Sequence, residues 1–267
     1  MAREALGRQD SIGELQRRIA ELQMRLSGGD GKPRGSRGRS IVVTRGLTKV
    51  YGRGATRTVA LRNVNLRVRK GEFIAVLGPS GSGKTTLLNV LGALDRPTKG
   101  RVFIDGIETS RVPESMLYRV RRGKLGFIFQ TYYLVPTLTA LQNVLTPVLP
   151  LGVNGAYHRR AAGLLKMVGL ERRMHHKPGE LSGGEQHRVA IARALILNPG
   201  IILADEPTGN LDSRTGAGII DLMQMLNKRQ GKTFVVVTHD HRIAEQSVRV
   251  YYLKDGRLST LPIELEE

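Results

Sequence analysis

The sequence predicts an α/β fold in which helices cover both faces of a parallel sheet. From Ile41 onward, apolar runs of strand length alternate with helical patterns. The apolar run Phe73–Leu77 leads into a glycine-rich turn, and the run Ile201–Ala204 ends in two acidic residues. With 267 residues and 40% hydrophobic content, the chain is long enough to bury a sizeable core.

The predicted elements follow in chain order. The expected strands are Ile41–Thr44, Val59–Val68, Phe73–Leu77, Val102–Asp105, Leu125–Phe129, Ile201–Ala204, Thr233–Val237 and Val248–Leu253. The expected helices are Gly83–Leu94, Thr137–Leu149, His158–Val168, Glu185–Leu197 and Arg214–Arg229. The helix-rich middle, about residues 130–195, is predicted to be an inserted α-helical subdomain.

The turn after Phe73–Leu77 fits the phosphate-loop pattern G-x-x-x-x-G-K-[ST]. Glycines let successive backbone N–H groups point inward, and the following helix N-terminus adds positive partial charge. Lys84 would supply a full charge to the β- and γ-phosphates, and the hydroxyl of Thr85 would coordinate Mg²⁺. The alternative is a glycine-rich turn that contains Lys-Thr by chance, which the flanking strand and helix disfavour. The predicted phosphate-binding residues are Gly78, Pro79, Ser80, Gly81, Ser82, Gly83, Lys84, Thr85 and Thr86.

The second acidic strand places two carboxylates side by side. Asp205 would lie at the carboxyl end of a parallel strand, where it could hold Mg²⁺. Glu206 would face the γ-phosphate and act as the general base on the attacking water. By itself the pattern is more typical of an ordinary strand that ends in a solvated acidic turn, but the phosphate loop about 120 residues upstream favours the metal and base assignments.

Composition excludes several classes of protein. The chain has no cysteine, which rules out disulfides, thiolate metal sites and cysteine nucleophiles. No apolar run is long enough to span a bilayer, and the N-terminus has no secretory signal pattern, so any membrane role is expected to come through a partner. The net charge of +19 is compatible with nucleic acid, with an anionic membrane leaflet or with a solvated basic surface.

The first 40 residues differ from the rest of the chain. Apolar residues recur at spacings of three and four, which predicts a short helix; they are Ile12, Leu15, Ile19, Leu22 and Leu26. A Gly/Arg/Ser-rich run over 32–40 predicts a flexible basic linker. The helix is either a frayed tail or a small docking helix for a partner, and the sequence leaves both open.

A third motif narrows the kind of phosphate-binding protein. The run Leu181–Gln186, with the sequence LSGGEQ, lies between the phosphate loop and the acidic strand and resembles the ABC signature motif. The chain therefore resembles ABC transporter ATP-binding subunits over about residues 41–260. This resemblance implies ATP as substrate, a P-loop NTPase core, an N-terminal antiparallel β subdomain and a short C-terminal tail, 261–267. His187 stands where glutamine is common in the family.

The resemblance also implies roles for further residues. Tyr51 matches the aromatic residue that stacks on adenine, and Gln130 matches the glutamine that senses Mg²⁺, water and the membrane partner. His239 matches the histidine that contacts the γ-phosphate. Ser182, Gly183 and Gly184 match the signature residues that close over the ATP held by a second subunit, and Gly209–Asp212 matches the loop that crosses that interface.

The implied active form is a head-to-tail homodimer that hydrolyses ATP and drives a separate integral-membrane permease. Its expected location is peripheral, on the cytoplasmic face of the inner membrane. The stretches Phe127–Gln130, Leu134–Ala140 and Pro207–Asp212 resemble the branch that contains lipoprotein-release, macrolide-export and FtsE-like cell-division ATPases.

Two alternatives remain at this point. One is a soluble ABC ATPase that acts on nucleic acid or ribosomes, which the net charge of +19 supports and the single cassette disfavours. The other is a non-enzymatic adaptor with an inactive site, which the complete set of expected catalytic positions disfavours.

Overall fold

A computed structural model of the protein describes residues 38–260. The strands are β1 (Ser40–Tyr51), β2 (Thr58–Val64), β3 (Arg67–Arg69), β4 (Phe73–Leu77), β5 (Lys99–Ile104), β6 (Ile107–Glu108), β7 (Leu125–Ile128), β8 (Ile201–Asp205), β9 (Thr233–Thr238), β10 (Arg249–Lys254) and β11 (Arg257–Ser259). The α-helices are α2 (Lys84–Leu91), α3 (Glu114–Lys124), α4 (Ala140–Leu145), α5 (Gly155–Met167), α6 (Gly183–Leu195), α7 (Ser213–Gln230) and α8 (His241–Glu245). The helix predicted near the N-terminus and the C-terminal tail lie outside the described residues and stay predictions.

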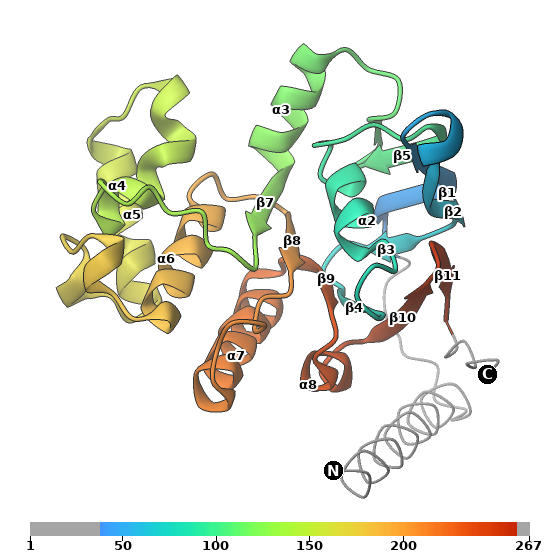
Figure 1. The fold of residues 1–267 in the computed structure, drawn as a ribbon. Coiled ribbons are helices and arrows are strands. Elements are labelled where there is room, and N and C mark those ends of the chain that lie inside the picture. The colour runs from blue at the N-terminus through green and yellow to red at the C-terminus, as the bar shows by residue number, and fades with distance from the viewer. Residues whose placement is uncertain (1–37, 261–267) are drawn as a thin grey trace, which may run out of the picture.

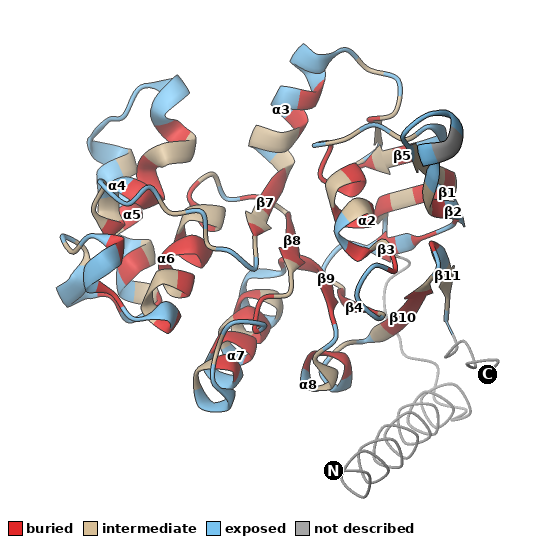
Figure 2. Ribbon diagram, in the orientation of Figure 1, coloured by how far each residue is buried: buried red, intermediate tan, exposed pale blue. Residues whose placement is uncertain are grey.

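The central sheet has the strand order β11-β10-β4-β9-β8-β7, parallel except for the antiparallel edge strand β11. Strand β4 is buried on both faces, which explains its continuous apolar sequence. Ile74 and Val76 pack toward α2 and the antiparallel sheet, whereas Phe73, Ala75 and Leu77 pack toward α7 and α8. The sheet therefore separates two cores, as the buried segments in Figure 2 show.

A second sheet is antiparallel and is formed by β2, β1, β5 and β6, with β3 also paired to β1. In Figure 1 it lies beside α2, on the opposite side of the central sheet from α4, α5 and α6. Helices α4, α5 and α6 share a core of their own, which includes Val144, Leu165 and Val189. The predicted fold class, with a parallel core, an antiparallel β subdomain and a helical subdomain, is confirmed.

Several predicted element boundaries were wrong for local reasons. The first strand continues to Tyr51 through register shifts on either side of Leu47, next to Gly46, which has a φ of +59°. The single strand expected over 59–68 is divided into β2, which ends at Val64, and β3, which begins at Arg67; Asn63, just before the break, has a φ of +52°. The helix expected over 137–149 changes at Thr146 into a 3-10 helix with proline near its start.

Helix α3 was not predicted. Among its residues only Leu117 and Val120 are buried, so the sequence carries little helical apolar pattern. The signals that could have identified it are the three-residue spacing of its buried positions, the acidic residue Glu114 in its first turn and the basic residues in its last turn, Arg121, Arg122 and Lys124. No helix within residues 38–260 is long and apolar enough to cross a membrane.

Candidate functional site

A cleft of about 510 Å³ opens where the carboxyl ends of β4 and β8 meet the antiparallel sheet. Because β4, β9 and β8 are neighbouring parallel strands, their carboxyl ends reach the same edge. The cleft brings together ten residues predicted from the sequence: Tyr51, Ser80, Gly81, Gly83, Lys84, Thr85, Thr86, Gln130, Asp205 and Glu206. The residues lining it do not include the other predicted ones, which are Gly78, Pro79, Ser82, Ser182, Gly183, Gly184 and His239.

Two glycines of the loop between β4 and α2, Gly78 and Gly83, are sterically required. A Cβ on Gly78 would lie 2.2 Å from the carbonyl oxygen of Leu253, and one on Gly83 would lie 2.4 Å from that of Ala60. Gly83 also has a φ of +103°, which side-chain-bearing residues rarely adopt. Helix α2 begins directly after it without a side-chain cap, so its first N–H groups are available to an anion at the helix N-terminus.

The side chain of Lys84 lies inside this loop and is almost fully buried. Its Nζ donates hydrogen bonds to the carbonyl oxygens of Gly78 at 2.7 Å and Pro79 at 3.0 Å. The same nitrogen lies 3.5 Å from Oε1 of Glu206. A positive charge is thus fixed at the centre of the cleft.

Asp205 and Thr85 lie together at the floor of the cleft. Burial raises the pKa of Asp205, with a smaller contribution from the charge of Glu206, while a hydrogen bond with Thr85 and the charge of Lys84 act in the opposite direction. No cluster of three His, Cys, Asp or Glu side chains that could hold a metal occurs within residues 38–260. A carboxylate, a hydroxyl and the nearby Gln130 amide nevertheless suit Mg²⁺, which takes few protein ligands and completes its shell with water and phosphate oxygens.

Glu206 is held in a strained backbone conformation, with a φ of +45°. Its Oε2 accepts hydrogen bonds from the Thr238 hydroxyl at 3.0 Å and the His239 backbone N–H at 3.2 Å. The Nδ1 of His239 lies 2.9 Å from the same oxygen, although the His239 side chain is largely exposed. The carboxylate is therefore fixed by β9, with Oε1 turned toward Lys84.

Gln130 follows β7 and is connected to the loop after β8. Asn210 donates from its side chain to the Gln130 carbonyl oxygen at 3.2 Å. A Cβ on Gly209 would lie 3.1 Å from the Gln130 side-chain nitrogen. The segment 209–212 therefore packs against the residue that lines the cleft.

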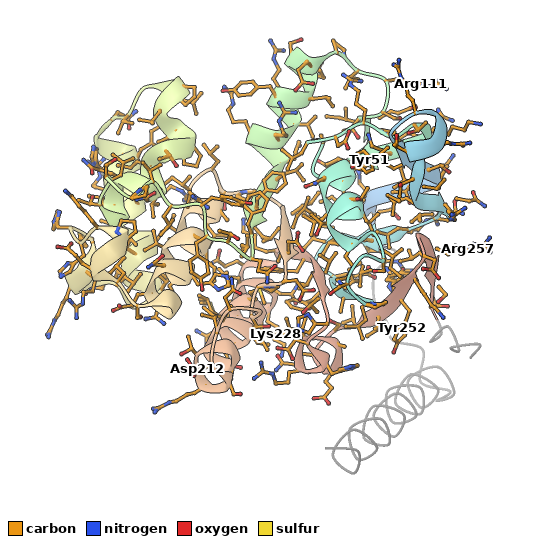
Figure 3. The ribbon with its side chains drawn as sticks, viewed as in Figure 1. Tyr51, Arg111, Asp212, Lys228, Tyr252 and Arg257 are labelled. Atoms are coloured by element: carbon orange, nitrogen blue, oxygen red, sulfur yellow. The ribbon has the colours of Figure 1, made fainter. Side chains whose placement is uncertain are left out.

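Tyr51 lies at the end of β1 and is about 41% exposed (Figure 3). Its hydroxyl donates to Oδ2 of Asp95 at 2.7 Å. The ammonium group of Lys49 lies 4.7 Å from the centre of the Tyr51 ring. Sequence reasoning missed Lys49 and Asp95, and no motif marks either residue.

Ser182, Gly183 and Gly184 form the start of α6, in the helical subdomain (Figure 1). The Ser182 hydroxyl accepts a hydrogen bond from the backbone of Glu185, whose carboxylate accepts one from the backbone of Ser182. The structure does not bring this motif to the cleft of its own chain.

Comparison with known proteins identifies the family. The ABC transporter family model matches residues 61–209. The uncharacterized ABC transporter ATP-binding protein MJ0796 of Methanocaldococcus jannaschii is 50% identical over 224 residues, which is 82% of this chain and 95% of that protein. This chain belongs to the ABC transporter family.

Other relatives agree with this assignment. The lipoprotein-releasing system ATP-binding protein LolD of Geobacter metallireducens is 47% identical over 220 residues, which is 82% of this chain and 98% of that protein. A solved dimer of MJ0796 in a post-hydrolysis state, bound to ADP and Pi, matches with a TM-score of 0.76 and 48% identity, covering 84% of this chain and all of that one. The chain is an ABC transporter ATP-binding subunit and an ATPase, which confirms the predicted function and enzyme class.

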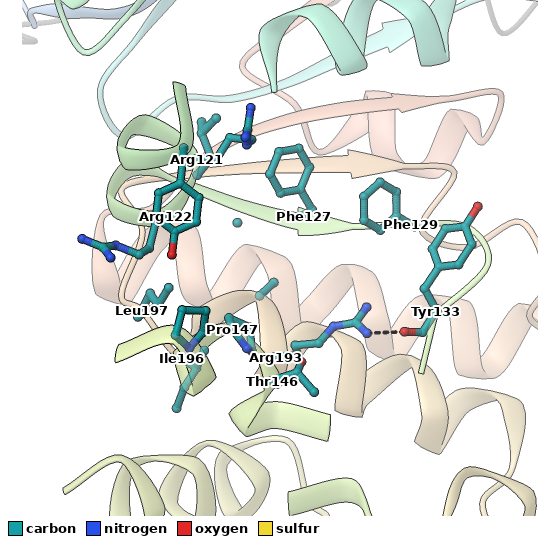
Figure 4. A pocket seen from close by; sticks show the side chains of 15 residues that line it. Arg121, Arg122, Phe127, Phe129, Tyr133, Thr146, Pro147, Arg193, Ile196 and Leu197 are labelled. Carbon is teal, nitrogen blue, oxygen red and sulfur yellow. Dashed lines mark hydrogen bonds between the residues drawn. The ribbon is translucent and has the colours of Figure 1, made fainter. Parts of the chain in front are cut away.

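This ABC subunit has a second hollow of about 480 Å³ between α3, β7 and the helical subdomain (Figure 4). Phe127, Phe129 and Pro147 give it an apolar wall. Arg193 of α6 donates to the backbone carbonyl oxygens of Tyr132 and Tyr133, and so ties the segment after Gln130 to the signature helix.

Proposed function

We propose that this ABC ATPase binds ATP–Mg²⁺ in the cleft at the carboxyl edge of its central sheet. The phosphate loop Gly78–Thr86 surrounds the phosphates, with Lys84 beside the β- and γ-phosphates and the adenine against Tyr51. The support is geometric: the loop amides, the buried ammonium and the exposed ring line one cleft. The fixed positive charge offsets the charge of a triphosphate, which is the main requirement for binding one.

Thr85, Gln130 and Asp205 would hold the Mg²⁺ ion. When bound, the ion neutralises phosphate charge and orients the phosphates. The hydrogen bond between Thr85 and Asp205 supports this assignment, because it brings a hydroxyl and a carboxylate to one point.

Hydrolysis requires a base, and Glu206 is assigned that role. Its carboxylate accepts a proton from the attacking water as the water oxygen bonds to the γ-phosphorus and the bond to the leaving ADP breaks. His239 donates a hydrogen bond to the γ-phosphate and, through Nδ1, contacts the base. Lys84, Gln130, Glu206 and His239 are therefore the proposed catalytic set.

The active form is a head-to-tail dimer in which Ser182, Gly183 and Gly184 of each copy contact the ATP held by the other. The separation of the signature motif from its own cleft supports this arrangement. So does the relative MJ0796, whose solved structure with ADP and Pi is dimeric. Segment 209–212 would lie at the dimer interface.

The output of the cycle is a change in the position of the helical subdomain, transmitted to a permease near Gln130. The hollow lined by Phe127, Phe129 and Pro147 fits an apolar partner segment at that place. The lipoprotein-releasing relatives support the proposed branch, and the permease would hold the subunit at the cytoplasmic face of the membrane. The comparisons give no support to the alternative that acts on nucleic acid or ribosomes.

The observation that carries the proposal is the convergence of Lys84, Asp205 and Glu206, from distant parts of the chain, on one cleft. The test is phosphate release from ATP by the purified full chain, with Mg²⁺ and with Mg²⁺ removed by a chelator. Hydrolysis that depends on Mg²⁺ and saturates with ATP is expected. Absence of ATP binding in the presence of Mg²⁺ would overturn the proposal.

A further inference from the structure

The aromatic platform at Tyr51 is attached to a part of the chain outside every motif that the function uses. Asp95 lies in the turn between α2 and β5, and its carboxylate bridges two residues of β1. Its Oδ2 accepts from the Tyr51 hydroxyl at 2.7 Å, while its Oδ1 accepts from Lys49 Nζ at 2.6 Å. Oδ1 also accepts the Arg96 backbone N–H at 2.7 Å, which fixes the carboxylate in its turn.

Lys49 is held in place from two sides. In addition to Asp95, its ammonium donates to the carbonyl oxygen of Arg96 at 2.8 Å, and its side chain is only 12% exposed. The ammonium lies 4.7 Å from the Tyr51 ring centre, so a fixed cation occupies one face of the ring. Only the opposite face is left for a base.

The turn that carries Asp95 is itself fastened to β1. The backbone N–H of Val50 donates to the Thr98 hydroxyl at 3.0 Å, and the Thr98 N–H donates to the carbonyl oxygen of Thr48 at 2.9 Å. Helix α2 begins at the phosphate loop and ends just before this turn. One helix therefore connects the phosphate-binding end of the cleft to the anchor of its aromatic end.

We propose that Asp95 and Lys49 are positioning residues for the nucleotide base: Asp95 fixes the Tyr51 ring through its hydroxyl, and Lys49 blocks one ring face, so that the base stacks on the other. The inference rests on the proposed function, because it assumes that Tyr51 stacks on the base. A tyrosine at a strand end loses rotational freedom when it binds a base, and the anchor removes that loss beforehand. Stacking is tolerant of base identity, so the effect should apply to ATP and GTP alike.

The experiment is a double-mutant cycle in the full chain, with Tyr51→Phe, Asp95→Ala, which removes the acceptor, and the combined variant. Calorimetric titration gives the Kd for ATP and for inorganic triphosphate, both with Mg²⁺. Each single variant should raise the Kd for ATP by about threefold to tenfold, the net worth of one hydrogen bond. The Kd of the combined variant for ATP should be no higher than that of the weaker-binding single variant, because both changes remove the same hydrogen bond.

Inorganic triphosphate separates positioning of the base from general damage. It has no base to stack, so its Kd should be the same in all three variants. Asp221→Ala, at an exposed carboxylate on α7, is the matched control and should leave both Kd values unchanged. Lys49→Met should also weaken the binding of ATP but not that of triphosphate, because methionine has no ammonium group to hold Asp95 and the Tyr51 ring.

Additive losses in the cycle, equal losses for triphosphate, or an unchanged Kd for ATP in the single variants would each overturn the inference. The variant Tyr51→Ala distinguishes failure of this inference from failure of the proposed function. Removing the ring should raise the Kd for ATP roughly tenfold or more if the base stacks on it. If Tyr51→Ala leaves ATP binding unchanged, the stacking role of Tyr51 is wrong. If Tyr51→Ala weakens ATP binding and Tyr51→Phe does not, only the anchoring role of Asp95 is wrong.

Discussion

The imidazole of His239 and the carboxylate of Glu206 are in direct contact, with Nδ1 of His239 2.9 Å from Oε2 of Glu206. The same oxygen accepts hydrogen bonds from Thr238 and from the His239 backbone. One carboxylate oxygen is thus fully engaged by the end of β9, and the other faces Lys84 across 3.5 Å. This geometry leaves the Lys84 side of the carboxylate for a water molecule.

Glu206→Gln should bind ATP but hydrolyse it at least about 100-fold more slowly, because an amide cannot accept the proton from water. The amide oxygen can keep the hydrogen bonds from Thr238 and the His239 backbone, so the fold should be retained. Phosphate release at saturating ATP and the Kd for ATP are the two measurements. Near-normal turnover in this variant would exclude Glu206 as the base.

The head-to-tail arrangement predicts complementation between two inactive variants. Lys84→Ala disables the cleft, and Gly183→Asp places a negative charge at the signature, where the structure has room for a side chain. Each should be inactive alone, whereas an equal mixture should recover about a quarter of normal ATPase activity, since half of the dimers then contain one complete site.

The control for the complementation is Gly163→Asp, the same change at an exposed position of α5, where a Cβ meets no atom of residues 38–260 within 4 Å. It should be active alone. A mixture of Lys84→Ala and Gly183→Asp that stays inactive would contradict sites shared between two copies.

Asp205→Asn should stabilise the fold while it removes Mg²⁺-dependent activity. Burial raises the pKa of Asp205, so the folded state disfavours the charged form. Asp205 therefore makes its full contribution to the free energy of unfolding at pH values below its unfolded pKa. That contribution is lost as the pH rises through the folded pKa, so the carboxylate destabilises the fold at neutral pH. Thermal melting at pH 7 without nucleotide should give a higher Tm for the variant; a lower Tm would show that the Thr85 and Lys84 contacts outweigh burial.

His187→Gln should make the protein less sensitive to acid. His187 is 1% exposed, its ring nitrogens have no hydrogen-bond partner among residues 38–260, and burial lowers its pKa from 6.5 to about 4. As the pH decreases, His187 is protonated in the unfolded chain before it is protonated in the folded one. The free energy of unfolding therefore falls between about pH 6.5 and pH 4, by up to about 3 kcal/mol for this residue. Urea unfolding at pH 7.5 and pH 5 should show a smaller loss in the variant than in the natural chain, and an equal loss would contradict the prediction.

Arg193→Met should destabilise the fold by about 2–4 kcal/mol, because it leaves two carbonyl oxygens without their donor. Those oxygens belong to Tyr132 and Tyr133, and burial also lowers the pKa of the Arg193 guanidinium. Urea unfolding measures the effect. Arg229→Met, an exposed arginine on α7, is the control and should change stability little; equal stabilities of the two variants would show that the contact contributes nothing.

Short-range patterns in the sequence determined the central strands, the phosphate loop and the two acidic residues after β8. An apolar run such as Phe73–Leu77, buried on both faces, and a loop of the pattern G-x-x-x-x-G-K-[ST] are local features, so the sequence shows them without the fold. The steric need for glycine at Gly78 and Gly83 comes instead from the carbonyl oxygens of Leu253 and Ala60, which are distant in the sequence. Helix α3 was not predicted, since it buries little apolar surface.

Only the tertiary structure decided which distant side chains meet. Asp95 reaches Tyr51 across 44 positions of sequence, and Glu206 reaches His239 because β9 lies beside β8 in the sheet. The signature residues, close in sequence to the acidic strand, lie instead on the helical subdomain, away from their own cleft. Hydrogen bonds and ion pairs act over a few ångströms in space, and that proximity comes from strand order and helix packing, which local sequence patterns do not encode.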